Sequence, residues 1–102
     1  KIKKIDTAMG TCSDGINRTV RKYLSQVKTC HDISLKNNPG VEGRVEVEVE
    51  IMDGKVTGTS LLKNSTGDSK VASCIEKKVR RWKFPSECSD IAVLPFALSP
   101  KN

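Results

Sequence analysis

The sequence is poor in the residues on which most catalytic and cofactor sites depend. It has one histidine, His31, four aromatic residues in 102, and no glycine-rich phosphate loop, Ser-His-acid arrangement or Cys-x-x-Cys pair. A zinc site is disfavoured because His31 directly follows Cys30, a spacing that zinc motifs rarely use. We therefore predict no enzyme, no metal, no cofactor and no small-molecule substrate.

Long apolar runs are also missing. No stretch approaches the roughly 20 apolar residues that a membrane span needs, and no secretory leader is visible. Because the chain starts at Lys1, we interpret it as a processed fragment whose export signal or membrane anchor lies upstream. A length of 102 residues suits one domain. We assign residues 1–8 to the end of an upstream linker and residues 9–102 to the domain.

Positive charge is in excess, with a formal net charge of +6. Such a balance suits nucleic acid or an anionic surface, but it also keeps a small domain in solution. A predicted strand carries Glu46, Glu48 and Glu50, and this acidic face would repel a phosphate backbone. We expect no nucleic-acid partner. A small basic nucleic-acid-binding domain remains the alternative, through Lys77, Arg80, Arg81 and Lys83.

The first half of the chain changes from helical to strand periodicity. Ser13 or Asp14 is the expected N-cap of a helix that ends before Pro39. Its apolar residues follow at helical spacing: Ile16, Val20, Tyr23, Leu24, Val27 and Cys30. From Gly43 to Met52 the period is two, with Val45, Val47, Val49 and Ile51 on one face.

The second half continues with a hairpin, a helix and a strand. Asp53-Gly54 predicts a tight turn into a return strand at 55–62. Val56 and Leu62 are expected to point inward, Thr57 and Thr59 outward, and Lys55 and Lys63 to offset the glutamates. Asp68 is the expected cap of a second helix, with Val71, Cys74, Ile75, Val79 and Trp82 on its apolar face. A strand at 90–98 completes an α+β fold. Its two layers follow the order α-β-β-α-β, with two helices on one face of a three-stranded antiparallel sheet.

The four cysteines predict two disulfides. Cys12 and Cys30 lie at opposite ends of the first helix, about 25 Å apart, so they cannot pair with each other. Two pairings remain. Cys30–Cys74 with Cys12–Cys88 requires antiparallel helices and is favoured; Cys12–Cys74 with Cys30–Cys88 requires parallel ones. Buried free thiols at Cys30 and Cys74 are the further alternative. A disulfide between helices indicates an oxidising compartment.

Several short segments, taken together, resemble the AgmX/PglI C-terminal domain, a branch of the TonB C-terminal domain family. They are Cys30-His31, Asn38-Pro39-Gly40, Gly43-Arg44-Val45-Glu46-Val47, Asp53-Gly54-Lys55-Val56, Asn64-Ser65-Thr66-Gly67-Asp68, Val71, Cys74, Arg80-Arg81-Trp82-Lys83-Phe84-Pro85 and Pro95-Phe96. The match extends over about residues 9–98, nearly the whole chain. The family pattern carries cysteines at the positions of Cys30 and Cys74, whereas Cys12 and Cys88 are an addition to it.

The resemblance implies a periplasmic, non-enzymatic adaptor domain of a Gram-negative envelope protein that is anchored in the inner membrane. Such domains belong to complexes for energy transduction, gliding motility or adhesion. The expected partner is a segment of an envelope or outer-membrane protein, bound by strand addition. A purely structural envelope module without strand exchange is a further alternative. The resemblance assigns no function to His31.

The last predicted strand is the expected docking edge. Pro95 lacks a ladder donor, which is tolerated mainly on an edge strand, and an edge can accept a partner strand. The edge residues are Ile91, Ala92, Val93, Leu94, Phe96 and Leu98. Alternation places Leu94, Phe96 and Leu98 in the core and leaves Ile91 and Val93 on the open face.

Overall fold

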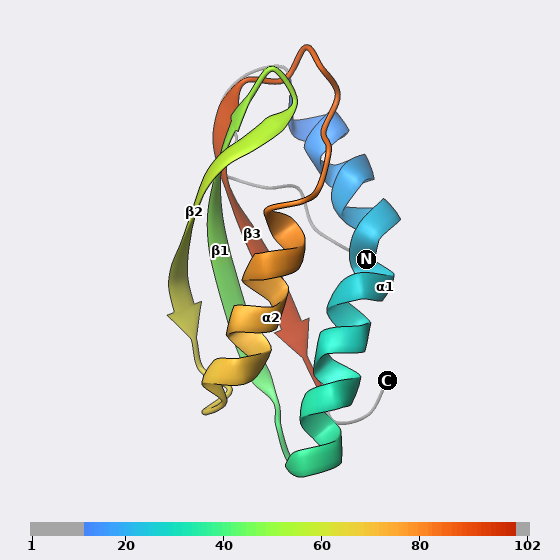
Figure 1. Ribbon diagram of the computed structural model, residues 1–102, viewed down its shortest axis with the longest axis vertical. Helices are drawn as coiled ribbons and strands as arrows, with labels where there is room; N and C mark the ends of the chain where they lie inside the picture. Colours follow the sequence, from blue (N-terminus) through green and yellow to red (C-terminus); the bar gives the residue numbers. More distant parts are fainter. Residues whose placement is uncertain (1–11, 100–102) are drawn as a thin grey trace.

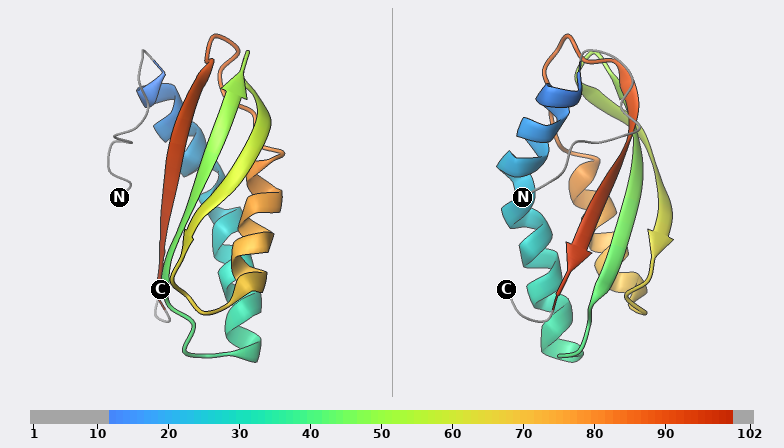
Figure 2. Two further views of the ribbon diagram at one scale, coloured as in Figure 1. Left: turned by 90° about the vertical axis from the view of Figure 1, so that its left-hand side faces the viewer. Right: turned by 180° about the vertical axis from the view of Figure 1, so that it is seen from behind.

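The computed structural model describes residues 12–99, so the expected linker at residues 1–8 and the domain boundary at residue 9 lie outside the described residues. The elements follow the order α1 (Ser13–Asn37), β1 (Gly43–Met52), β2 (Lys55–Asn64), α2 (Ser69–Val79) and β3 (Asp90–Leu98) (Figure 1). The antiparallel sheet has the order β2-β1-β3. Both helices cover the same face of it (Figure 2), as the sequence predicted. No helix among residues 12–99 is long and apolar enough to cross a membrane.

The core lies between the sheet and the two helices. Strand β1 contributes Val45, Val47, Val49 and Ile51, all at most 1% exposed, because its alternation turns every second residue toward the helices. The other layers supply Ile16, Val20 and Val27 from α1, Val71, Ile75 and Val79 from α2, and Ala92, Leu94, Phe96 and Leu98 from β3. Leu24 is the exception in the expected apolar face of α1, since it is 37% exposed.

The start of α1 differs from the expectation. The N-cap is Cys12, which has no side-chain cap hydrogen bond, and Ser13 and Asp14 are the first residues of the helix itself. The Cys12 carbonyl accepts the first helical bond from the Ile16 N–H at 2.8 Å. The sulfur of Cys12 is bonded to Cys88, so a covalent link holds this helix start where a polar cap was expected.

The predicted directions of two side chains in strand β2 are wrong. No β1 residue lies opposite Leu62, because Glu46 pairs with Lys63 and Val47 pairs with Leu61. No β1 residue lies opposite Thr57 either, because Glu50 pairs with Gly58 and Ile51 pairs with Val56. Each bulge adds one residue and reverses which face the following side chains occupy. Leu62 is therefore 51% exposed rather than inward. Thr59, expected to face outward, donates its hydroxyl to Glu76 of α2 at 2.8 Å.

The other β2 expectations hold in part. Val56 is half-buried and packs against the core, and Thr57 is exposed. Lys63 lies opposite Glu46, as the expected charge offset requires, whereas Lys55 lies opposite Met52.

Trp82, which was expected on the apolar face of the second helix, lies beyond the end of α2. The helix ends at Val79, and Trp82 follows it in a turn. Trp82 is nevertheless 2% exposed and belongs to the core, as expected for an anchor. The hairpin at Asp53 and Gly54 is confirmed, with φ of 51° and 81°.

Candidate functional site

Within residues 12–99, the outer strands of the sheet are β2 and β3, and they differ in regularity. Strand β3 pairs with β1 in an unbroken register from Gly43–Leu98 to Ile51–Asp90. Strand β2 has two register shifts, and its Thr59 is tied to α2 through Glu76. Because bulges twist an edge away from further pairing, β3 is the better template for a partner strand.

The expected docking residues all lie on β3, and they occupy two faces. Ala92, Leu94, Phe96 and Leu98 are buried, so their side chains belong to the core. Ile91 is 51% exposed and Val93 is half-buried, on the face away from the helices. The expected alternation is confirmed, whereas the binding role of this strand stays a prediction.

Two features limit unwanted pairing along β3. Pro95, which lies opposite Glu46, has no N–H to offer. The N–H of Ile91 donates to the carboxylate of Asp90 at 2.8 Å. The missing N–H of Pro95 was expected from the sequence, whereas the hydrogen bond from Ile91 to Asp90 was not. Both devices reduce indiscriminate edge-to-edge association.

Two disulfides connect the elements that carry this edge. Cys30 on α1 is bonded to Cys74 on α2, with Cα atoms 5.8 Å apart. Cys12 is bonded to Cys88 just before β3, with Cα atoms 5.5 Å apart. All four cysteines are paired. The helices run antiparallel (Figure 1), which is the arrangement that the favoured pairing required.

The polar residues of the types used in catalysis, His31 and Asp68, have structural partners. His31 is buried, and its Nε2 lies 3.0 Å from the Val41 carbonyl oxygen, so Nε2 carries the proton and donates. Asp68 caps α2 by accepting from the Lys70 N–H at 2.8 Å, as predicted. Among residues 12–99, no group of three or more His, Cys, Asp or Glu side chains is placed to hold a metal ion.

Asp68 also joins the two helices. The Ser34 hydroxyl at the end of α1 donates to its carboxylate. This bond, together with the backbone N–H of Lys70, lowers the pKa of Asp68 below its ordinary value of 3.8. The cause is that both donors stabilise the charged form. The cap prediction found Asp68 but had no signal for Ser34, which lies 34 residues earlier.

The other notable surface is a groove between α1 and α2, with a volume of about 820 Å³. The indole N–H of Trp82 donates to the Gln26 amide oxygen at 2.9 Å in this groove. Tyr23 stacks on Trp82, with ring centroids 5.1 Å apart. Lys77, Arg80 and Arg81 line it, whereas Lys83, the fourth residue of the nucleic-acid alternative, does not. The sequence analysis missed Gln26, because nothing in its spacing indicates a bond to a residue 56 positions away.

The comparisons with known proteins give one neighbour. No family model and no curated protein matches the chain. Among solved structures, it is similar to the NMR solution structure of the Helicobacter pylori TonB C-terminal domain, residues 179–285. The two share 25% identity, and the match covers 91% of this chain and 97% of that chain with a TM-score of 0.48.

Proposed function

We propose that this chain is a non-enzymatic, TonB-like adaptor domain that operates in the periplasm of a Gram-negative bacterium. It belongs to an inner-membrane-anchored protein of a complex for energy transduction, gliding motility or adhesion. Its partner is a segment of another envelope protein or of an outer-membrane protein, which pairs with β3. The observation that carries the proposal is the regular pairing of the nine-residue strand β3, in contrast to the irregular β2 on the opposite edge of the sheet.

The disulfides support the compartment. Cytosolic thiols are kept reduced, whereas bonds such as Cys30–Cys74 persist in exported domains. The Cys12–Cys88 bond also fixes the loop that leads into β3, because Cys88 lies two residues before Asp90. A fixed outer strand lowers the ordering cost of pairing with a partner strand.

The polar contacts support a binding rather than a catalytic role. The His31 imidazole is committed to the Val41 carbonyl, and the Asp68 carboxylate to the start of α2. The Glu76 carboxylate accepts from Thr59 and lies 3.4 Å from Arg80. Backbone groups along an edge strand, by contrast, can supply affinity without any reactive side chain.

A photocrosslinking experiment in the native bacterium tests the role of β3. A benzophenone amino acid at the exposed Ala97 of β3 is compared with the same residue at the exposed Ser60 of β2. We expect Ala97 to crosslink to one envelope protein, within a short segment of it, and Ser60 to give no such product. Equal products from both sites, or none from Ala97, would contradict docking at β3 and favour a purely structural module.

A backbone substitution separates strand addition from ordinary surface contact. Ala97 lies two residues after Pro95, so its N–H points to the same side as the donor that Pro95 lacks. Ala97→Pro should abolish the crosslink from a probe at Ile91, whereas Ala97→Ser, which keeps the N–H, should preserve it. The thermal midpoint of both variants should stay close to that of the unmodified protein. Retained crosslinking in a folded Ala97→Pro variant contradicts strand addition.

A further inference from the structure

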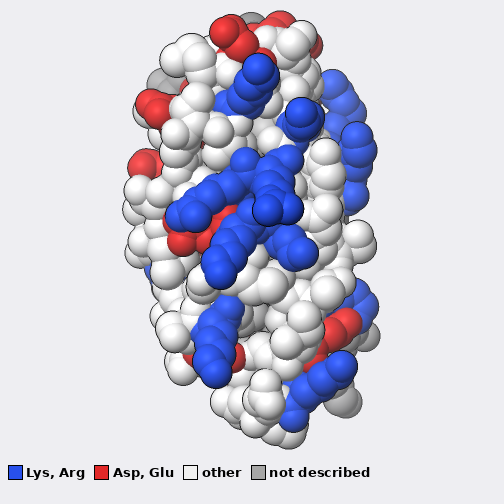
Figure 3. Space-filling view, viewed as in Figure 1, with Lys and Arg blue, Asp and Glu red and all other residues white. Residues whose placement is uncertain are grey.

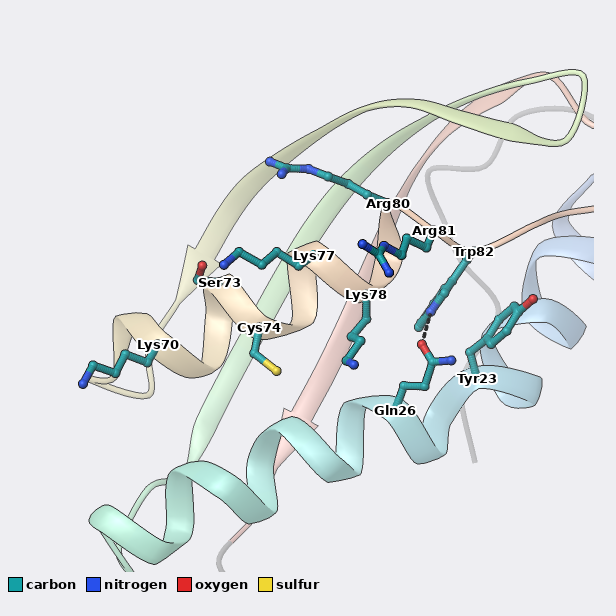
Figure 4. Close-up of a pocket in the computed structure, with 10 residues that line it drawn as sticks. All are labelled: Tyr23, Gln26, Lys70, Ser73, Cys74, Lys77, Lys78, Arg80, Arg81 and Trp82. Carbon is teal, nitrogen blue, oxygen red and sulfur yellow. Dashed lines mark hydrogen bonds between the residues drawn. The ribbon is translucent and has the colours of Figure 1, made fainter.

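The groove between α1 and α2 is strongly cationic and lies on the helical layer, away from the proposed docking edge. Figure 4 shows its lining side chains, of which Lys70, Lys77, Lys78, Arg80 and Arg81 carry positive charge. None of the ten lining residues is acidic. Figure 3 shows the corresponding concentration of lysine and arginine over this face of the molecule.

Most of these charges are not neutralised within the domain. Arg80 is the exception, because it bonds to Thr59 at 3.0 Å and lies 3.4 Å from Glu76. In the described part of the chain, no carboxylate lies within ion-pair distance of Lys77, Lys78 or Arg81. Like charges that crowd one concave surface repel one another, and an anionic occupant relieves that repulsion.

We propose that this groove binds an acidic peptide segment of a second partner protein. Lys70 and Lys77 are seven residues apart on α2, so about 10 Å separates their positions along the helix. That distance is about three residues of a polyproline II chain, whose side chains return to the same face at every third residue, so carboxylates at this spacing meet successive cations. Arg81 adds a forked donor set that suits a carboxylate.

The aromatic residues of the groove argue against a nucleic-acid strand. Bases need exposed ring faces on which to stack. Trp82 is 2% exposed, with the Tyr23 ring stacked on its indole and the Phe96 ring edge-on at 6.1 Å. Tyr23 in turn has the Lys22 ammonium 5.4 Å from its centroid. Both rings are therefore already engaged within the domain.

The shape and the remaining charges argue against two other occupants. A planar anionic membrane does not follow a hollow of about 820 Å³ between two helices, whereas an extended segment does. The acidic sheet face of a second copy is already partly engaged. Arg44 pairs with Glu46 at 2.8 Å, and the Thr57 hydroxyl donates to Glu50 at 2.9 Å.

The test uses the whole oxidised chain and a labelled peptide of about twelve residues with glutamate at every third position, the repeat of a polyproline II chain. Fluorescence anisotropy at fixed ionic strength gives its affinity, and the glutamine version of the peptide is the matched control. Lys77→Gln with Arg81→Gln removes two groove charges. The control variant, Lys36→Gln with Lys63→Gln, removes two exposed charges outside the groove and has the same net charge as the groove variant.

We expect the groove variant to weaken binding by about fivefold or more and the control variant by less than about twofold, given the usual strength of exposed charge pairs. The indole N–H signal of Trp82 and the side-chain amide of Gln26 should shift on titration. Equal weakening by both variants overturns the proposal, as does the absence of binding. Tighter binding of an oligonucleotide of equal charge, of anionic vesicles or of a second copy of the chain also overturns it.

Discussion

Replacing Cys30 and Cys74 together by alanine removes the covalent link between α1 and α2. The bond closes a loop with a sequence separation of 44 residues. In the chain-entropy account, a loop of this length stabilises the folded state by about 4 kcal/mol, because the cross-link restricts the unfolded chain. The free energy of unfolding of a small domain is about 5–15 kcal/mol. We therefore expect the variant to stay folded at 25 °C, with a thermal midpoint lower by roughly 15–30 °C.

Urea unfolding of the oxidised protein, followed by circular dichroism, measures this loss. The denaturant dependence of the free energy should rise in the variant, because an unlinked chain exposes more surface when it unfolds. Cys12→Ala with Cys88→Ala is the matched control, and its loop of separation 76 predicts a similar loss of about 4.5 kcal/mol. A loss below about 1 kcal/mol for the Cys30–Cys74 pair would refute the loop-closure reasoning.

Two further substitutions test single positions. Gly54→Ala places a Cβ 2.6 Å from the Phe84 carbonyl oxygen at a φ of +81°, so the free energy of unfolding should fall by roughly 2 kcal/mol or more. Gly67→Ala, at a φ of +78° with no atom within 4 Å of the new Cβ, should lower the free energy of unfolding by less. Equal losses for the two variants in urea unfolding would contradict a steric clash at Gly54 as the cause. Asp68→Asn removes a carboxylate whose pKa in the folded protein is lowered by the Ser34 hydroxyl. The charged carboxylate therefore stabilises the fold above the unfolded-state pKa of 3.8, and this stabilisation is lost as the pH falls through the pKa of the folded state. The difference in stability between the two proteins should therefore be largest above about pH 4 and shrink in more acidic solution, and a difference that is constant with pH would contradict this cause.

The parts of the fold that depend on local chemistry could be predicted from the sequence. The valines of β1 alternate without interruption, so its buried face is unambiguous. Asp53-Gly54 supplies the positive φ of the hairpin, and Asp68 supplies a side-chain oxygen at the start of α2. The long helix between Cys12 and Cys30 excludes one of the three disulfide pairings, and the favoured one of the remaining two is confirmed because the helices run antiparallel.

The features that depend on packing between distant elements could not be predicted in this way. The bulges at Thr57 and Leu62 reverse the facing of β2, and although Gly58 lies beside the first, no glycine or proline marks the second. Trp82 continues the spacing of the α2 apolar face although the helix ends at Val79, since a core position can be filled from a turn as well as from a helix. The groove needs both helices in place, so the partnership of Trp82 with Gln26 had no local signature.

The free-thiol count of the protein isolated from its native cells is the most direct test of an exported adaptor domain. Isolation with immediate alkylation, followed by intact mass, counts the modified cysteines. The structure pairs Cys12 with Cys88 and Cys30 with Cys74, so the account predicts no alkylated cysteine. Alkylation of all four cysteines would contradict both the oxidising compartment and the periplasmic adaptor function proposed from it.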